Sequence, residues 1–286
     1  MHTDVRLADR VQRIAAFSVG NQGGNPAGVV IYDVFPDDVV MQRIAAQVGY
    51  SETAFAVESG NGWRVRYFSP ESEVPFCGHA TIALGAALAR EKGDGIFALT
   101  TNNADITVEA QQAGDLIRAA LQSPATRSSG METDLQAEVL ALFGYSANDL
   151  DMRIPPARAN AGADHLILAL KTREQLSAME YDLAAGREFM KRFGVTTVAW
   201  MHAETSTRFH SRNAFASGGI YEDPATGAAA AALAGYLRDI GWAHNGGIDI
   251  LQGQDMGRPS HLRAEFSFVP GSSVRVSGTA RMITEK

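Results

Sequence analysis

The sequence predicts an α+β protein of two pseudo-symmetric lobes, each a curved, mostly antiparallel β-sheet rolled around a central helix. Two segments of small residues indicate the central helices: GHATIALGAALARE at residues 78–91, and the five alanines at residues 228–232. A helix enclosed by a sheet must be apolar on nearly every side, and small side chains let the strands approach it closely. Strands and helices do not alternate as βαβ units, which argues against a doubly wound parallel sheet.

The first half of the chain reads as short strands separated by turns, with two helices. A helix is predicted at residues 37–48, because Val40, Ile44 and Val48 recur at helical spacing. The turn sequence SGNG at residues 59–62 lies between two β-rich runs and is typical of a hairpin. The expected strands lie at residues 11–19, 27–32, 53–58, 63–68, 96–101, 105–110 and 116–121.

A boundary between the lobes is predicted at SPATRSSGMETD, residues 123–134, which is polar and contains Pro, Ser and Gly as linkers do. We therefore assign residues 1–122 to the N-terminal lobe, with the C-terminal strand 272–286 as a candidate to complete it, and residues 134–271 to the C-terminal lobe. The expected helices of the second lobe lie at residues 135–143, 183–193 and 226–238. Its expected strands lie at residues 165–170, 195–202, 248–252, 262–269 and 274–276.

The two halves also resemble each other in the order of their segments. Arg66 lies eleven residues before Cys77, and Arg212 lies eleven residues before Asp223. Superposing the halves on this spacing aligns Cys77 with Asp223 and predicts an internal duplication. The same alignment places residues 195–196 opposite Glu52.

Composition limits the possible partners. The chain has 286 residues, enough for two compact lobes, and a net charge of −7 without a lysine-rich stripe. These features argue against nucleic acid and against an anionic membrane surface. There is no apolar stretch of about 18 residues and no signal-peptide pattern, so we expect a cytoplasmic protein.

Metal and cofactor motifs are absent from the sequence. A single cysteine excludes an internal disulfide framework and a cysteine-rich zinc site. There is no phosphate loop, no dinucleotide fingerprint and no G-x-S-x-G motif, so we expect neither a metal nor a cofactor. Several histidines lack metal-ligand spacing and are interpreted as core or surface residues: His165, His202, His210, His244 and His261.

The starts of the two central helices predict an anion-binding site. The first turn of a helix has unpaired backbone N–H groups and the positive end of the helix dipole, which together bind a carboxylate or an enolate. If the lobes pack face to face, both helix starts meet at one cleft. Cys77, His79 and Asp223 lie at these starts, and Glu52 follows a predicted helix. Because the second half lacks an acid aligned with Glu52, one carboxylate acting as base and acid is favoured over a two-base racemase.

Five motifs, in this order, resemble the phenazine-biosynthesis PhzF family, which shares the diaminopimelate epimerase fold. They extend over nearly the whole chain: GNPAGVV, SETAF, RYFSPESEVPFCGHAT, GIYEDPATGAAA and QGQDMGRPS. The resemblance implies a cofactor-independent isomerase, usually a homodimer, with its site between two lobes. The PhzF enzyme moves a hydrogen within a dihydro-hydroxyanthranilate, so the resemblance implies a small carboxylate-bearing substrate.

The resemblance also implies roles for individual residues. Glu52 takes the place of the family's proton-shuttle glutamate, and His79 and Asp223 take the places of its catalytic histidine and aspartate. Ala228 stands where the PhzF enzyme has a serine that contacts the substrate. The chain can therefore resemble the family without catalysing the family's best-known reaction. The candidate substrate-binding residues are Asn25, Cys77, Gly78, Thr226, Gly227 and Ala228.

Two alternative functions remain open at this point. One is an amino-acid racemase or epimerase on the same fold, against which the single cysteine argues. The other is a non-catalytic protein that binds a small anion and has kept the scaffold, which the missing hydroxyl at Ala228 permits. Hydrogen exchange at a substrate carbon distinguishes an isomerase from such a binding protein.

Overall fold

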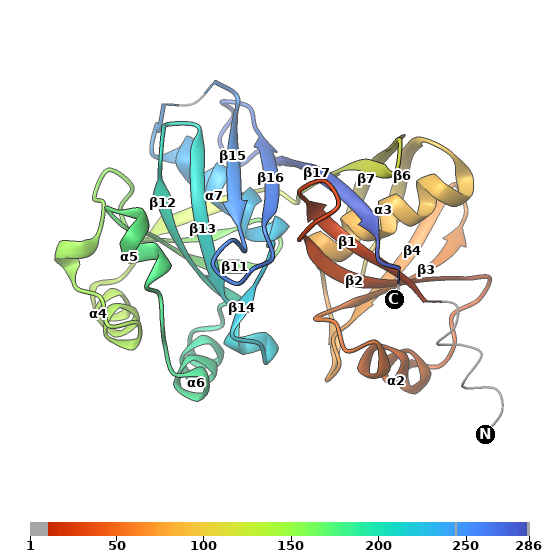
Figure 1. The fold of residues 1–286 in the computed structure, drawn as a ribbon, viewed down its shortest axis with the longest axis horizontal. Helices are drawn as coiled ribbons and strands as arrows, with labels where there is room; N and C mark the ends of the chain where they lie inside the picture. The colour runs from red at the N-terminus through yellow and green to blue at the C-terminus, as the bar shows by residue number, and fades with distance from the viewer. Residues whose placement is uncertain (1–10, 244, 285–286) are drawn as a thin grey trace. The chain divides into compact units, whose positions relative to one another are not determined.

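The computed structural model describes residues 11–243 and 245–284. The chain divides into two compact units: the first contains the described residues up to Gln122 and those from Ser277 onward, and the second is Ser123–Val276. Each unit consists of strands with one long helix among them (Figure 1). This arrangement confirms the predicted α+β fold class.

The strands of the first unit close into a ring. β17 pairs with both β1 and β8, and the remaining strands pair in chain order between these two. The pairings β2–β3 and β4–β6 are parallel. The strands are β1 (Gln12–Ser18), β2 (Asn25–Tyr32), β3 (Thr53–Ser59), β4 (Gly62–Phe68), β6 (Gly95–Thr100), β7 (Asp105–Ala113), β8 (Leu116–Gln122) and β17 (Arg275–Met282). The two-residue strand β5 (Glu73–Val74) pairs with β4.

Helix α3 (Gly78–Lys92) lies inside this ring (Figure 1). It is buried from Gly78 to Ala89 and contacts β1, β2, β7 and β8. Its small residues are required by this enclosure. A Cβ added to Gly85 would lie 2.5 Å from Cγ2 of Val108 in β7, so the strand lies against the helix backbone itself. The sequence of small residues therefore predicted the position of this helix correctly.

The second unit repeats this plan with seven main strands. β11 and β12 pair in parallel, as do β13 and β15, and the two-residue strand β14 (Glu222–Asp223) pairs with β13. The central helix α7 (Gly227–Asp239) packs against β9, β10, β15 and β16. The strands are β9 (Arg127–Gly130), β10 (Ala157–Asn160), β11 (Asp164–Ala169), β12 (Thr197–Ala203), β13 (Arg208–Ala214), β15 (Gly247–Gln252) and β16 (Ser260–Glu265).

Smaller helices cover the outer face of each sheet. In the first unit, α2 (Asp38–Val48) packs its apolar side chains against Phe55 and Phe68. In the second unit the outer face, which includes Trp200, is covered by three helices: α4 (Thr133–Leu142), α5 (Arg173–Ser177) and α6 (Leu183–Phe193). Two single 3-10 turns complete the described structure, η1 (Ala147–Asp149) and η2 (Ala216–Gly218). The central helix of each unit therefore lies on the inner face of a two-sided sheet.

The strand pairings support the internal duplication. Antiparallel and parallel pairings alternate in the same order along β1–β2–β3–β4–β6–β7 and along β10–β11–β12–β13–β15–β16. In this correspondence β5 matches β14, and α3 matches α7. The two units therefore carry one topology twice.

The strand register corrects the alignment predicted from the sequence. Three residues separate the end of β5 from the start of α3, and three separate the end of β14 from the start of α7. Cys77 therefore matches Thr226, and Asp223 matches Val74, so the predicted match of Cys77 with Asp223 is wrong. Equal spacing from the arginines misled the alignment because the connection from β13 to β14, which contains η2, is three residues longer than that from β4 to β5.

The residue that matches Glu52 also differs from the prediction. The arginine of β4 pairs with Phe55, and the corresponding arginine of β13 pairs with Trp200. Counting back three residues from Phe55 and from Trp200 matches Glu52 with Thr197. The sequence alignment had placed residues 195–196 opposite Glu52. The prediction that no acid occupies this place is unchanged.

The polar segment at residues 123–134, predicted from its composition as the boundary between the lobes, is a structured part of the second unit. It contains β9, which pairs with β10, and the backbone N–H of Thr126 donates to the carbonyl of Gly271. A Cβ added to Gly235 of α7 would lie 2.7 Å from the Cβ of Thr126. The segment is therefore part of the wall around α7, and its backbone pairing outweighs its linker-like composition.

His165 in β11 makes the stability of the second unit dependent on pH. The ring is fully buried, its Nδ1 lies 2.8 Å from Oγ1 of Thr197, and its Nε2 has no hydrogen-bond partner among the described residues. Burial lowers the pKa of His165 from 6.5 to about 4. The unfolded chain then binds this proton more tightly, so stability is complete above about pH 6.5 and falls as the pH drops towards 4.

We expect a loss of about 2 kcal/mol in the free energy of unfolding between pH 7.5 and pH 5 from this residue. Urea unfolding of wild type and His165→Gln at both pH values measures it, and the variant should lose that part of the dependence. His261→Gln, at an exposed histidine, is the control and should keep it. A His165→Gln protein with the wild-type pH dependence would contradict the assignment.

Candidate active site

The first unit brings three of the candidate residues together at the start of α3. Oε2 of Glu52 lies 3.3 Å from Nε2 of His79, and Sγ of Cys77 lies 3.3 Å from Nδ1 of the same ring. Glu52, Cys77 and His79 are 5%, 8% and 4% exposed, so all three are enclosed. Oγ of Ser51 lies 3.3 Å from Nε2 of His79 as well. A carboxylate, a thiol and an imidazole thus lie close together in the interior of the first unit.

The backbone of Glu52 is held at the entry to β3. Its carbonyl accepts a hydrogen bond from the N–H of Gly28, and the next residue, Thr53, pairs with the same glycine. A Cβ at Gly28 would lie 2.7 Å from Oγ1 of Thr53, so this approach requires glycine. Oε2 of Glu52 is buried and has no hydrogen-bond partner among the described residues, although Nε2 of His79 lies 3.3 Å away. Such an oxygen is costly to leave unpaired, which indicates a place for a donor from a bound molecule.

Cys77 is the N-cap residue of α3, and a buried chain of hydrogen bonds fixes its backbone. The hydroxyl of Thr81 donates to the carbonyl of Cys77 at 2.7 Å, and Oη of Tyr67 donates to Thr81 at 2.7 Å. Burial raises the pKa of Tyr67, so this phenol remains a donor. No side chain caps α3, and the N–H groups of its first turn, including that of Gly78, are not taken by a cap.

Asn25 lies in the same unit, at the first position of β2, where it is 1% exposed and pairs with Ala16 of β1. The register of β1 shifts between Ala16 and Ser18, and the intervening Phe17 has a φ of 60°. A left-handed residue that is not glycine is strained by about 1–3 kcal/mol, and such strain is often found beside functional sites. Turn chemistry alone does not explain this strained bulge. Its position opposite Asn25 therefore supports Asn25 as a candidate site residue.

The second unit holds Asp223 in a buried network of hydrogen bonds. Oγ1 of Thr226 donates to Oδ2 of Asp223 at 2.6 Å. Nε2 of Gln252 donates to the carbonyl of Asp223 at 2.6 Å and to Oγ1 of Thr226 at 3.0 Å. Asp223 belongs to β14, and Thr226, three residues later, is the N-cap residue of α7.

Gln252 also determines which amides of α7 remain available. Its Oε1 accepts the backbone N–H of Thr226 at 3.1 Å, so that amide is already used. The N–H groups of Gly227 and Ala228 follow in the first turn, which no side chain caps. Ala228 is the second residue of α7 and matches His79, the second residue of α3. The second unit thus has a methyl group where the first has an imidazole.

Gln252 is a functional candidate that was not predicted from the sequence. The motif QGQDMGRPS contained the signal, because its first glutamine is followed at once by a glycine. That glycine, Gly253, has a φ of 74°, and a Cβ there would lie 2.3 Å from the carbonyl oxygen of Arg258 and 2.8 Å from that of Pro224. The close turn directs Gln252 against the segment that leads into α7.

We expect Gln252→Leu to lower the free energy of unfolding by about 2 kcal/mol, because the N–H of Thr226 and the carbonyl of Asp223 lose their buried partner. Urea unfolding measures the change. Gln254→Leu, two residues away and exposed, should change stability by less than about 0.5 kcal/mol. Equal losses in the two variants would show that the network does not hold this segment.

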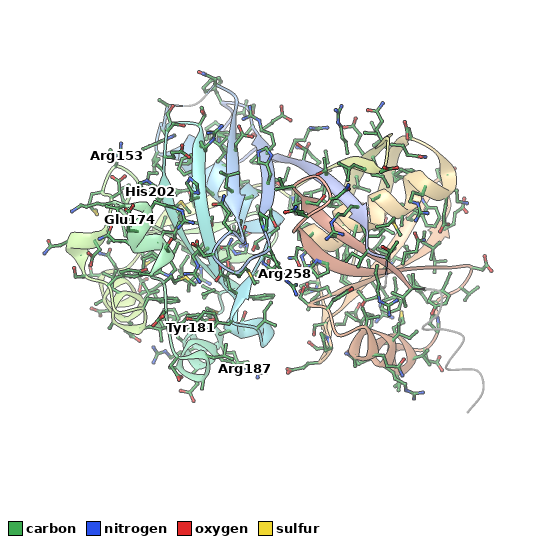
Figure 2. The ribbon with its side chains drawn as sticks, viewed as in Figure 1. Arg153, Glu174, Tyr181, Arg187, His202 and Arg258 are labelled. Carbon is green, nitrogen blue, oxygen red and sulfur yellow. The ribbon has the colours of Figure 1, made fainter. Side chains whose placement is uncertain are left out.

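The other histidines do not form a further cluster of this kind within the described residues. Nδ1 of His202 lies 3.2 Å from the carbonyl of Leu170, and His210 and His261 each contact a single carboxylate. Figure 2 labels His202, Arg153 and Glu174 on the second unit. His244 lies outside the described residues. These positions agree with core or surface roles for the described histidines.

No described helix is both long and apolar enough to cross a membrane. Comparisons with known proteins point to one family. The model of the phenazine biosynthesis-like protein family PhzC-PhzF matches residues 14–286. An uncharacterized isomerase of Deinococcus radiodurans is 32% identical over 288 residues, covering 96% of this chain and 93% of that protein.

A trans-2,3-dihydro-3-hydroxyanthranilate isomerase of Pseudomonas fluorescens is 32% identical over 274 residues, covering 93% of this chain and 94% of that protein. Among solved structures, a PhzF-family phenazine biosynthesis protein of Bacillus anthracis shares the fold, with a TM-score of 0.82, 22% identity and 96% of each chain covered. The match extends through both units and through the motifs that carry Glu52, His79 and Asp223. The chain therefore belongs to the phenazine biosynthesis-like PhzC-PhzF family.

Proposed function

We propose that this protein is an isomerase of the PhzF type that moves a proton between two carbon atoms of a small carboxylate-bearing substrate, without a cofactor. The observation that carries the proposal is the carboxylate of Glu52, which is 5% exposed and leaves Oε2 without a hydrogen-bond partner among the described residues. Relatives that span nearly the whole chain are named isomerases, which supports this class of reaction.

In the proposed mechanism, Glu52 takes a proton from one substrate carbon and returns it to another. The electron pair left behind shifts the double bond along the substrate, so no atom is gained or lost overall. His79, 3.3 Å from Glu52, orients the carboxylate between these two steps. Negative charge develops on the substrate carboxylate during the reaction, and its oxygens accept hydrogen bonds from backbone N–H groups at a helix start. The N–H groups of Gly78 and Gly227 are the candidates for these donors.

The substrate is proposed to differ from dihydro-hydroxyanthranilate in its contact with α7. Ala228 is 8% exposed and offers only a methyl group and its backbone, where the resemblance implies a serine hydroxyl. A substrate without a polar group at that position fits the methyl group better, because an unpaired buried hydroxyl or amine would lose its hydrogen bond with water.

A two-step experiment tests the function. A library of small carboxylates, including trans-2,3-dihydro-3-hydroxyanthranilate, is screened by thermal shift, and each hit is then incubated in D2O and followed by NMR. We expect at least one hit to incorporate deuterium at carbon and to yield a double-bond isomer. Tight binding without exchange for every hit would favour the non-catalytic anion-binding protein instead.

The racemase alternative is disfavoured by the second unit. Thr226 matches Cys77 at the N-cap position, and its hydroxyl already donates to Asp223. A two-thiol mechanism therefore lacks its second thiol. Exchange at a single carbon with inversion of configuration, and without a shift of a double bond, would support this alternative against the isomerase.

Asp223 is proposed to act as a polar partner in the same reaction. We expect Asp223→Asn to lower kcat/KM by about tenfold or more while leaving the fold intact, because the amide oxygen can still accept from Thr226 but the charge is lost. The double variant with Glu52→Gln should be no slower than Glu52→Gln alone, since residues that serve one step are not additive. Independent, multiplying losses would place Asp223 outside that step.

A homodimer in the cytoplasm is the proposed state of the protein, in line with the family resemblance. The chain has a single cysteine, Cys77, and so cannot form a disulfide within itself, which suits a reducing compartment. Sedimentation equilibrium of the full chain measures the mass directly. A mass equal to that of one chain at micromolar concentration would contradict the dimer.

A further inference from the structure

We propose that Glu52, Cys77 and His79 form a binding site for a thiophilic divalent cation of the Zn2+ class. The site goes beyond the isomerase, whose proposed reaction needs no metal. It is the one group of three potential metal ligands among the described residues, and all of its ligand atoms lie within 4.8 Å of one another. Sequence spacing excluded a metal here because Glu52 and Cys77 are far apart in the chain and meet only in the fold.

The donor set and its spacing suit such a cation. Zinc is bound by thiolate sulfur, imidazole nitrogen and carboxylate oxygen at about 2.0–2.3 Å, which puts neighbouring ligand atoms of a tetrahedron about 3.3–3.8 Å apart. Oε2 of Glu52 lies 3.3 Å from Nε2 of His79, and Sγ of Cys77 lies 3.9 Å from the same nitrogen. The sulfur thus lies just beyond this range, and a thiolate ligand favours Zn2+ over hard cations such as Mg2+, which avoid sulfur.

A second observation points to a ligand at this place. Oε2 of Glu52 has no hydrogen-bond partner among the described residues, and the residue is only 5% exposed, so water does not readily replace that partner. A bound cation would satisfy that oxygen. The start of α3 opposes a cation with about half a positive charge, but a thiolate and a carboxylate together contribute two negative charges. The three side chains leave a fourth coordination position for water or a substrate oxygen.

The second unit provides an internal comparison. The residues that match Cys77, His79 and Glu52 there are Thr226, Ala228 and Thr197, none of which is a zinc ligand of this kind. The duplicated topology therefore carries the ligand set once, and one cation per chain is expected. A cation on Oε2 of Glu52 occupies the carboxylate that takes and returns the proton in the proposed reaction, so it would inhibit the isomerase.

Cadmium is a sharp probe because Cys77 is the only cysteine in the chain. The reduced, chelator-treated full-length protein is titrated with Cd2+, and the ultraviolet absorption of a cadmium–thiolate bond is followed. That absorption can arise from Cys77 alone. We expect it to saturate at one equivalent, and Zn2+ to displace it. Absence of the absorption with a stoichiometric excess of Cd2+ would overturn the proposal.

Variants separate this site from adventitious binding. Cys77→Ser should remove the absorption and weaken Cd2+ binding, measured by calorimetry, by tenfold or more; Glu52→Gln should keep the absorption but weaken binding by a similar factor. His261→Gln, at an exposed histidine–carboxylate pair, is the matched control and should change neither. Unchanged affinity in Cys77→Ser or in Glu52→Gln would overturn the site. Near-ultraviolet circular dichroism verifies folding, and no readout depends on turnover, so the isomerase stands or fails separately.

Discussion

Glu52→Gln is expected to lower kcat/KM by about 10²–10⁴-fold on the substrate found by the exchange screen, with the fold unchanged. The amide keeps the shape of the side chain but cannot accept and return a proton, and general acid–base groups contribute factors of this size. Deuterium incorporation at the substrate carbon, measured by NMR, should fall in parallel. The exchange rate reports the proton transfer itself, whereas turnover also includes product release.

Stability distinguishes the chemical role of Glu52 from a structural one. Because Oε2 has no hydrogen-bond partner among the described residues, loss of its charge should leave the midpoint of thermal unfolding unchanged or raise it. Glu58→Gln, in strand β3 that directly follows Glu52, is the matched control because its side chain is 66% exposed, and it should retain full activity. Wild-type exchange in Glu52→Gln would remove Glu52 from the reaction, whatever its stability.

The fold could be predicted where small or apolar residues alone determine an element. Both central helices were predicted because a helix inside a ring of strands tolerates little beyond alanine, glycine and compact apolar side chains. β13 was not, because its sequence, RFHSRNA, shows no apolar alternation. Arg212 and Ser211 are buried there through partners elsewhere in the chain: Ser211 donates to the carbonyl of Trp200, and Arg212 to Glu222. Hydrogen bonds to residues this far away in the chain cannot be predicted from the local sequence pattern.

The candidate site shows the same division. Glu52, Cys77 and His79 could be proposed together because the family motifs mark them, and the fold does bring these three within contact. Gln252 could not, because its role consists of hydrogen bonds to residues 26 and 29 positions away in the chain. The residue-by-residue match between the two halves was also predicted wrongly. Counting along the sequence fails after a loop whose length differs between the halves, whereas strand pairing identifies the matching residues on both sides of that loop.

Arg212→Met is expected to destabilise the protein by about 3–5 kcal/mol, measured by urea unfolding at pH 7.5. The guanidinium of Arg212 lies 2.6 Å from Oε2 of Glu222, and the two side chains are 9% and 3% exposed. It also donates to the carbonyls of Ser177 and Met179, at 2.8 and 3.1 Å. Removing one partner of a buried pair leaves the other charge uncompensated, and that penalty accounts for the expected loss.

The first unit contains the matched control. Arg66 occupies the corresponding position in β4 and pairs with Glu73 of β5 at 2.6 Å, but these side chains are 18% and 27% exposed. Because water compensates the remaining carboxylate there, Arg66→Met should cost only about 1 kcal/mol. Similar losses in the two variants would show that burial of the pair is not the cause.

A double variant separates the cost of an unpaired charge from the cost of lost packing. Arg212→Met combined with Glu222→Leu should recover most of the stability, since no charge then remains buried. Activity should not recover with it. Glu222 is adjacent to Asp223 in β14, and the arginine that joins this short strand to the carbonyls of Ser177 and Met179 is absent from the double variant. We therefore expect a stable protein whose kcat/KM remains low, because the position of Asp223 depends on a contact that stability alone does not restore.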